Sequence, residues 1–361
     1  MLKLRNKVLK YHIIFLEANN LMKTPLNLFP FNPHPFLKGG HRQTILGYYL
    51  PSPKHLRGTN VHYIKISGGD KLALCENRPN RKSTFQRAIL FMHGLGGKAG
   101  SSYMLRIAHL FQNRGWITFR MNHRGCGEGI GLARQTYHSG RSEDASAAMI
   151  KIEELYPHSP LVTVGFSLSG NILLKLLGEK KEPLATNLAG AIAVAPPINL
   201  SLCAAALCQS QNRVYDLRFM RLLKKAMKER REHFLDFPEF DFKWWMKLRD
   251  FDELCTASLN NFKSAEDYYS KCSAKQFLSE VSTPTYLLAS DDDPFVPKES
   301  FDDLPENEFL DFNLTKSGGH MGYVSAEKTP LGTHRWLDYA VLAYAENLIK
   351  DREKLFFADK E

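Results

Sequence analysis

Short apolar runs alternate with longer amphipathic stretches through much of the chain. Each run has the length of a strand buried on both faces, and the runs lie at residues 88–92, 116–121, 161–166, 189–195, 285–289 and 308–314. Helical periodicity separates them, at positions 104, 107, 108 and 111, over 143–156 and 169–178, and at 337, 341, 344 and 348. This alternation predicts an α/β fold with a mostly parallel central sheet flanked by helices.

Two regions depart from that alternation. Residues 61–66 and 72–77 form a predicted hairpin of two strands, and residues 22–60 before it, rich in Pro, Phe and Gly, indicate an extended arm. Residues 201–275 have helical composition and no strand pattern. We therefore predict an N-terminal arm over 1–60, a core of 61–200 and 276–361, and a helical cap inserted at 201–275.

The composition is that of an ordinary globular protein, with 43% hydrophobic and 24% charged residues among 361. Lysine and arginine number 48 against 38 acidic residues, which gives a net charge of +10. The densest basic stretch, 218–231, is typical of the solvated face of a helix, with a membrane-facing or anion-binding patch as the alternative. No aromatic and basic module accompanies it, so we predict no nucleic-acid partner.

The cysteines and the N-terminus bear on the compartment. Six cysteines without a C-x-x-C pair do not make a disulfide framework and favour a reducing, cytoplasmic setting. The apolar run at 11–16 is too short for a signal peptide, and no stretch reaches the roughly 18 apolar residues of a membrane-spanning helix. Two alternatives stay open: peripheral membrane contact through the basic N-terminus or the cap, and a start at Met22 rather than Met1.

The strongest local pattern lies where a buried strand runs directly into a helix. The segment GFSLSG (165–170) joins the run 161–166 to the helix at 169–178. A serine in such a sharp turn, between small neighbours, exposes its hydroxyl above a helix N-terminus, whose dipole favours developing negative charge. We therefore predict Ser167 as a nucleophile. The usual pattern is G-x-S-x-G, and Ser169 occupies the place of its last glycine.

A serine nucleophile needs a base and an orienting carboxylate, and candidates follow in the order Ser, acid, His. Three aspartates stand in the segment SDDDPFVP (290–297), and we select Asp293 from its spacing to the second proline. His320 follows in SGGHMG (317–322), where the glycines let the loop approach the serine closely. The predicted triad has His320 as general base and Asp293 as the acid that orients it.

A glycine-rich loop supplies the predicted oxyanion hole. The run 88–92 ends in HGLGG (93–97). The backbone amide of Leu95 in that loop and the amide of Leu168, directly after the nucleophile, are the expected donors to a developing oxyanion. The sequence contains neither H-E-x-x-H nor paired C-x-x-C motifs, and no metal site is predicted.

These motifs together resemble the YheT-like hydrolases, AB hydrolase family four of the α/β-hydrolase superfamily. The resemblance begins near residue 36 and rests on segments such as FLKGGHRQTI (36–45), MNHRGCGEG (121–129), YHSGRSEDASA (137–147) and GGHMGY (318–323). It implies the α/β-hydrolase fold, a triad of Ser167, Asp293 and His320, and no metal or organic cofactor. Two residues depart from the family pattern: Ser169 replaces a glycine, and His123 stands where an aromatic residue is common.

Three hypotheses for function follow. The first is hydrolysis of carboxylic esters with short, medium or lipid-like acyl chains, through an acyl-enzyme on Ser167. The second is transfer of the same acyl group to an alcohol, and the third is a catalytically inactive binding protein of this fold. The expected partner is a small-molecule or lipid ester, and no pattern indicates an oligomeric state.

Overall fold

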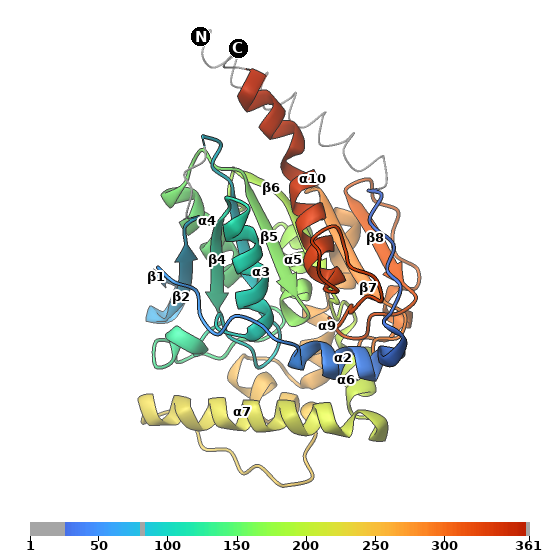
Figure 1. Ribbon diagram of the computed structural model, residues 1–361. Coiled ribbons are helices and arrows are strands. Elements are labelled where there is room, and N and C mark those ends of the chain that lie inside the picture. The colour runs from blue at the N-terminus through green and yellow to red at the C-terminus, as the bar shows by residue number, and fades with distance from the viewer. Residues whose placement is uncertain (1–25, 80–83, 359–361) are drawn as a thin grey trace.

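The computed structural model describes residues 26–79 and 84–358, and its centre is a single eight-stranded sheet (Figure 1). The strands lie in the order β1-β2-β4-β3-β5-β6-β7-β8. Their bounds are β1 Asn60–Lys65, β2 Lys71–Asn77, β3 Ala88–Met92, β4 Ile117–Asn122, β5 Leu161–Phe166, β6 Leu188–Val194, β7 Thr285–Ser290 and β8 Leu310–Thr315. β2 pairs antiparallel with β1 and β4, and the other pairings are parallel, which confirms the predicted mostly parallel sheet.

Helices cover both faces of this sheet. The helices α3 (Ser102–Asn113) and α10 (Trp336–Ala358) contribute to one hydrophobic cluster, whereas α4 (Ser142–Leu155) and α5 (Leu168–Glu179) contribute to another. Every residue of β3, β4, β5 and β7 is buried, because each of these strands has helices on both sides. The stripes predicted at 104–111 and 337–348 are the buried faces of α3 and α10.

The connection between β6 and β7 is long and mostly helical. It contains α6 (Leu200–Leu207), α7 (Arg213–His233), α8 (Leu248–Phe251), a π-helical turn (Asp252–Ala257) and α9 (Ala265–Cys272). Figure 1 shows α7 crossing beneath one end of the sheet, with α2 and α6 beside it. This is the end at which β5 gives way to α5, so the connection covers the carboxyl edge of the parallel strands. The division of the chain into arm, core and cap stays a prediction.

The segment expected to be an extended arm contains a helix, α2 (Gly40–Tyr49). Its buried residues are Gly40, Gln43 and Gly47, a helical spacing that carries no apolar side chain. The glycines permit very close packing, because a Cβ on Gly40 would lie 1.6 Å from the carbonyl oxygen of Asp292. A helix with such a face has no hydrophobic stripe, which is why the periodicity did not predict it.

Membrane contact was left open by the sequence, and the described helices bear on one form of it. Within residues 26–79 and 84–358, none of the helices has the length and apolar character that crossing a bilayer requires. The N-terminal segment 1–21, one of the two places proposed for membrane contact, lies outside the described residues.

Candidate active site

Ser167 stands in the tight turn between β5 and α5. Its backbone has φ 53° and ψ −121°, a conformation that residues with side chains rarely adopt. The turn leaves no room for a side chain at Gly165, where a Cβ would lie 2.3 Å from the carbonyl oxygen of Ser169. The Ser167 N–H donates to the carbonyl of Val194 on β6 at 2.8 Å, which ties the bend to the sheet. The strained backbone conformation at Ser167, which sets the position of its hydroxyl, is thus held by backbone contacts.

The imidazole of His320 lies between Ser167 and Asp293. Its Nε2 is 2.9 Å from Ser167 Oγ, and its Nδ1 is 2.7 Å from Asp293 Oδ2. Because a carboxylate only accepts hydrogen bonds, Nδ1 carries the hydrogen and Nε2 is left to accept from the serine hydroxyl. The structure therefore brings together the three residues selected from the sequence, in the hydrogen-bonded order that a serine nucleophile requires.

Asp293 is the one of the three consecutive aspartates whose carboxylate faces the histidine. Its Oδ1 accepts hydrogen bonds from the backbone amides of Phe295 and Val296, at 3.1 and 3.0 Å, which turns Oδ2 towards His320. Asp292 has a different role, because its Oδ1 accepts a hydrogen bond from the Gly319 amide at 2.8 Å. The neighbouring acid thus braces the loop that carries the histidine.

That loop is also held by α2, which the sequence did not place at the site. The His320 amide donates to Thr44 Oγ1 at 2.8 Å. The buried Gln43 side chain donates to the carbonyl of Val324 at 3.1 Å and accepts from its amide at 2.7 Å. A Cβ on Gly322 would lie 2.3 Å from the Gln43 carbonyl oxygen, so the loop and the helix are in close contact. The GGHRQT segment (39–44), which entered the sequence analysis only through the family resemblance, therefore helps to position His320.

A row of rings continues from the histidine into the β6–β7 connection. The Phe295 ring lies 4.1 Å from the His320 ring, and Tyr215 of α7 lies 5.2 Å from Phe295. His41 of α2 stacks on Tyr215 at 5.7 Å, with its Nδ1 3.0 Å from the tyrosine oxygen. These contacts join α2 and α7 beside the loop that carries His320. The sequence predicts none of these ring contacts, because ring packing leaves no pattern in a single sequence.

The HGLGG loop lies directly against the serine. A Cβ on Gly94 would be 3.0 Å from the Cβ of Ser167. Leu95 and Leu168 both line the cavity that contains Ser167. Leu168 is the first residue of α5, so its amide has no intrahelical acceptor, and neither amide donates to any acceptor within the described part of the chain. Both amides are therefore free to donate beside Ser167, and their role as an oxyanion hole stays a prediction.

The two departures from the family pattern meet beneath this loop. Ser169 Oγ donates to the carbonyl of His93 at 2.5 Å, and His123 Nε2 lies 2.7 Å from Ser169 Oγ and 3.1 Å from the same carbonyl. Since the hydroxyl hydrogen is used on the carbonyl, His123 donates from Nε2. Burial lowers the pKa of His123 far below its usual value and that of His93 to about 4, so both rings stay neutral.

A largely apolar cavity that opens to solvent adjoins Ser167. Most of its wall comes from the β6–β7 connection, including Leu200, Phe219, Leu223, Met227 and Phe251. Arg230 and Asp252 are the charged residues among its lining. The Asp252 carboxylate accepts from Thr256 and Tyr269, each at 2.7 Å, and burial raises its pKa to about 6. The cavity therefore suits an apolar chain better than a highly charged one.

The mostly parallel sheet, the helices on both faces and the serine bend after β5 define an α/β hydrolase. The chain belongs to the family described as serine aminopeptidase, S33, whose model matches residues 83–308. This family model spans the five strands β3 to β7 with the β6–β7 connection, and it ends just before β8.

Relatives narrow the class further. "Putative esterase YheT" of Escherichia coli (strain K12) is 29% identical over 282 residues, which are 76% of this chain and 81% of that one, and this confirms the YheT-like resemblance. "Phospholipase ABHD3" of Mus musculus is 28% identical and covers 78% of this chain and 70% of its own. The esterase Pf2001 of Pyrococcus furiosus matches in fold, with a TM-score of 0.50 at 15% identity over 83% of this chain and 99% of that one. These names support a hydrolase.

Proposed function

We propose that the protein is a serine hydrolase that cleaves carboxylic esters through an acyl-enzyme on Ser167. The observation that carries the proposal is the pair of contacts from Ser167 to His320 and from His320 to Asp293, at 2.9 and 2.7 Å. The similarity to proteins named esterase and phospholipase is consistent with an ester substrate.

In acylation, Ser167 Oγ attacks the ester carbonyl carbon while its proton passes to His320 Nε2. Negative charge develops on the carbonyl oxygen, where the amides of Leu95 and Leu168 donate; one such donor typically lowers the barrier by about 3–4 kcal/mol. Asp293 accepts from Nδ1 and stabilises the imidazolium. The C–O bond then breaks, and His320 returns the proton to the departing alcohol.

In deacylation, water takes the place of the alcohol. Its proton passes to His320 as its oxygen attacks the acyl carbon, and the bond to Ser167 Oγ breaks with return of that proton. The products are a carboxylic acid and the free serine. An alcohol that replaced this water would give a new ester instead, so hydrolysis and acyl transfer share every step up to this point.

The cavity supports an apolar acyl or alkyl portion in the substrate. Its lining is predominantly hydrophobic, with Arg230 and Asp252 as the charged members, which favours an apolar chain over a charged one. We place the substrate among medium-chain and lipid-like esters.

The six cysteines are unpaired, which agrees with a proposed cytoplasmic location.

Hydrolysis of p-nitrophenyl esters of graded chain length tests the proposal. Wild type should hydrolyse them, with a preference for medium chains, and should react with a fluorophosphonate probe. Ser167→Ala should lose probe labelling and at least about 1,000-fold in turnover. Ser279→Ala, at an exposed serine away from the cavity, is the matched control and should behave as wild type. Turnover retained by Ser167→Ala would refute the assignment.

Two further measurements separate the alternatives. An ester product formed on addition of an alcohol would indicate acyl transfer. A folded wild type that neither reacts with the probe nor turns over any ester would indicate a binding protein. Aminoacyl p-nitroanilides extend the panel to the amide chemistry that the family's description names.

A further inference from the structure

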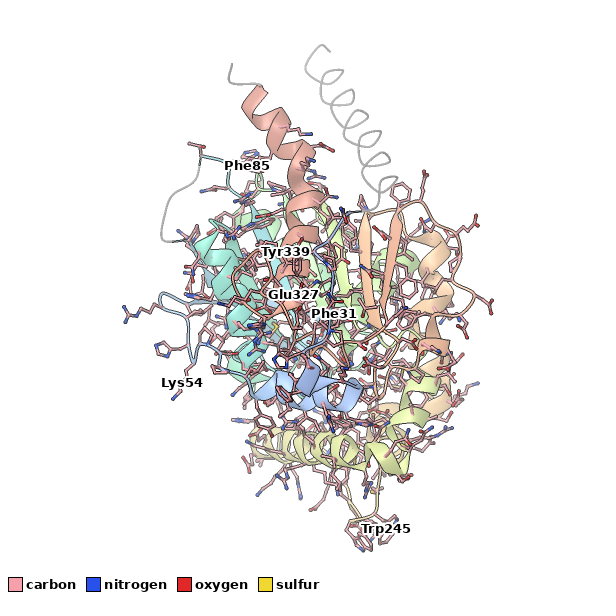
Figure 2. All side chains as sticks on the ribbon, turned by 45° about the vertical axis from the view of Figure 1, so that its right-hand side comes forward. Phe31, Lys54, Phe85, Trp245, Glu327 and Tyr339 are labelled. Carbon is pink, nitrogen blue, oxygen red and sulfur yellow. The ribbon has the colours of Figure 1, made fainter. Side chains whose placement is uncertain are left out.

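A loop between α7 and α8, residues 234–247, projects from the molecule beyond the long helix α7 (Figures 1 and 2). Trp244 and Trp245 stand on it, and Figure 2 places Trp245 at the outermost point of that end. Their side chains are 82% and 55% exposed, and the two rings pack edge to face at 5.8 Å. Two adjacent exposed indoles form an apolar patch that water solvates poorly.

Other exposed apolar side chains gather at the same end of the molecule. They come from α2, α6, α7 and the projecting loop, which lie together in Figure 1. The set includes Leu46, Tyr49, Leu202, Val214, Leu217 and Leu235, the last of them 94% exposed. Exposed hydrophobic residues thus concentrate around the end that holds the candidate active site.

The outer face of α7 is basic. Its exposed cations recur every three or four residues, which places them along one side of the helix: Arg218, Arg221, Lys225, Lys228 and Arg231. Lys225 pairs with Glu229 at 3.5 Å, and Arg231 pairs with Glu239 at 2.6 Å. Arg221 and Lys228 have no ion-pair partner among the described residues, so their charges are free to meet an external anion.

The inner face of the same helix lines the cavity. Phe219, Leu223 and Met227 point to the cavity that contains Ser167, while the basic residues face solvent. One helix thus separates the cavity from the basic surface. A surface or molecule bound to the outer face of α7 would lie about one helix diameter, roughly 10 Å, from the cavity wall.

We propose that this end of the molecule docks on an anionic phospholipid bilayer. Indole rings prefer the boundary between headgroups and acyl chains, and basic side chains are drawn to anionic headgroups. The exposed tip and the basic stripe supply both, on adjacent elements. The docking is independent of the chemistry; that it brings lipid esters to Ser167 rests on the proposed function.

The tryptophans also provide a specific signal for the test. The chain has four, and the other two, Trp116 and Trp336, are buried at 0% and 2% exposure. A blue shift of tryptophan fluorescence on adding vesicles therefore reports Trp244 and Trp245. We expect this shift, with co-sedimentation, for vesicles of phosphatidylcholine containing phosphatidylglycerol, with weaker binding to phosphatidylcholine alone and at high salt.

Paired variants separate the two contributions. Trp244→Ala/Trp245→Ala should weaken vesicle binding about tenfold or more. Arg221→Gln/Lys228→Gln should weaken it about 25-fold, because each basic residue at an anionic surface typically contributes about fivefold. The matched controls are Tyr63→Ala, at a side chain also 55% exposed but on β1, and Lys181→Gln/Lys350→Gln, which changes the net charge equally. Both controls should bind as wild type.

The outcomes keep docking and chemistry apart. The docking variants should turn over a soluble short-chain ester at the wild-type rate, and Ser167→Ala should bind vesicles as wild type does. Vesicle binding with no dependence on Ser167 for turnover would leave docking intact and refute the proposed function. Absence of binding to anionic vesicles, or equal losses in the controls, would overturn the docking. So would a dimer in light scattering that Trp244→Ala/Trp245→Ala abolishes, which would assign this surface to a second copy.

Discussion

Ser167 and His320 meet across a single contact of 2.9 Å, yet they are held there by different means. Ser167 is fixed by consecutive residues: a buried strand, a bend with positive φ and the first turn of a helix. His320 sits in the loop after β8, and its amide donates to Thr44, a residue 276 positions away in the sequence. One side of the site is built locally and the other by remote contacts.

The difference explains what each side tolerates. A bend made of backbone has no substitute for its small residues, because the obstacle to a side chain is another part of the main chain. A loop held by side-chain hydrogen bonds loses one contact at a time, and its other contacts remain. Substitutions in the bend should therefore abolish the site, and substitutions in the remote contacts should weaken it.

The largest effect is expected at Gly165. A Cβ there would lie 2.3 Å from a backbone oxygen, so Gly165→Ala must displace the bend that carries Ser167. Because a displacement of about 1 Å can cost about 100-fold in rate, we expect esterase turnover to fall at least that far, with a lower melting temperature. Gly100→Ala is the matched control, since its Cβ would meet nothing closer than 3.8 Å. Normal turnover by Gly165→Ala would contradict a bend fixed by backbone.

A smaller loss is expected at Thr44. Thr44→Val keeps the shape but leaves the His320 amide without its acceptor, at a typical cost of about 1–3 kcal/mol. Because Thr44 is not part of the cavity wall, kcat should fall about tenfold while KM changes little. Thr44→Ser retains the hydroxyl and should restore kcat. Equal rates for the valine and serine variants would show that α2 does not position the histidine.

A still smaller loss is expected where Ser169, which follows the bend, shares an acceptor with a remote residue, His123. The His93 carbonyl receives a hydrogen bond from Ser169 at 2.5 Å and has His123 Nε2 at 3.1 Å, so either donor alone satisfies it. Ser169→Ala and His123→Phe should each lower turnover only about threefold, and the double variant should lose more than the product of the two. Rates of fluorophosphonate labelling check this. Simple multiplication of the two effects would mean that the residues do not share the carbonyl.

The same distinction explains which features could be predicted from the sequence. The runs 88–92 and 161–166 match β3 and β5 residue for residue, because burial on both faces leaves a continuous apolar signal. The helix α2 was missed because Gly40, Gln43 and Gly47 make its buried face. Ser169 and His123 were both noticed as departures, but nothing in one sequence indicates that residues 46 positions apart share a hydrogen bond.

The choice among adjacent acids shows the same limit. Asp293 was selected from its spacing to a proline, and the structure turns its carboxylate to His320 through the amides of Phe295 and Val296. The carboxylate of Asp292, one residue earlier in the same acidic run, instead accepts from the Gly319 amide. The local motif places the loop, and only the folded backbone separates neighbouring side chains within it.

The smallest effect is expected at Asp252, a buried carboxylate with one partner in its own helical turn, Thr256, and one on α9, Tyr269. Burial raises its pKa from 3.8 to about 6. Between these values the unfolded chain releases the proton first, so this group's contribution to stability declines as pH rises from about 4 to 6 and stays low above that. Asp252→Asn removes the decline. Its melting temperature relative to wild type should therefore increase over that interval, by roughly 1–3 °C. A flat difference between Asp252→Asn and wild type would mean that the two hydroxyl partners fully offset the cost of burial.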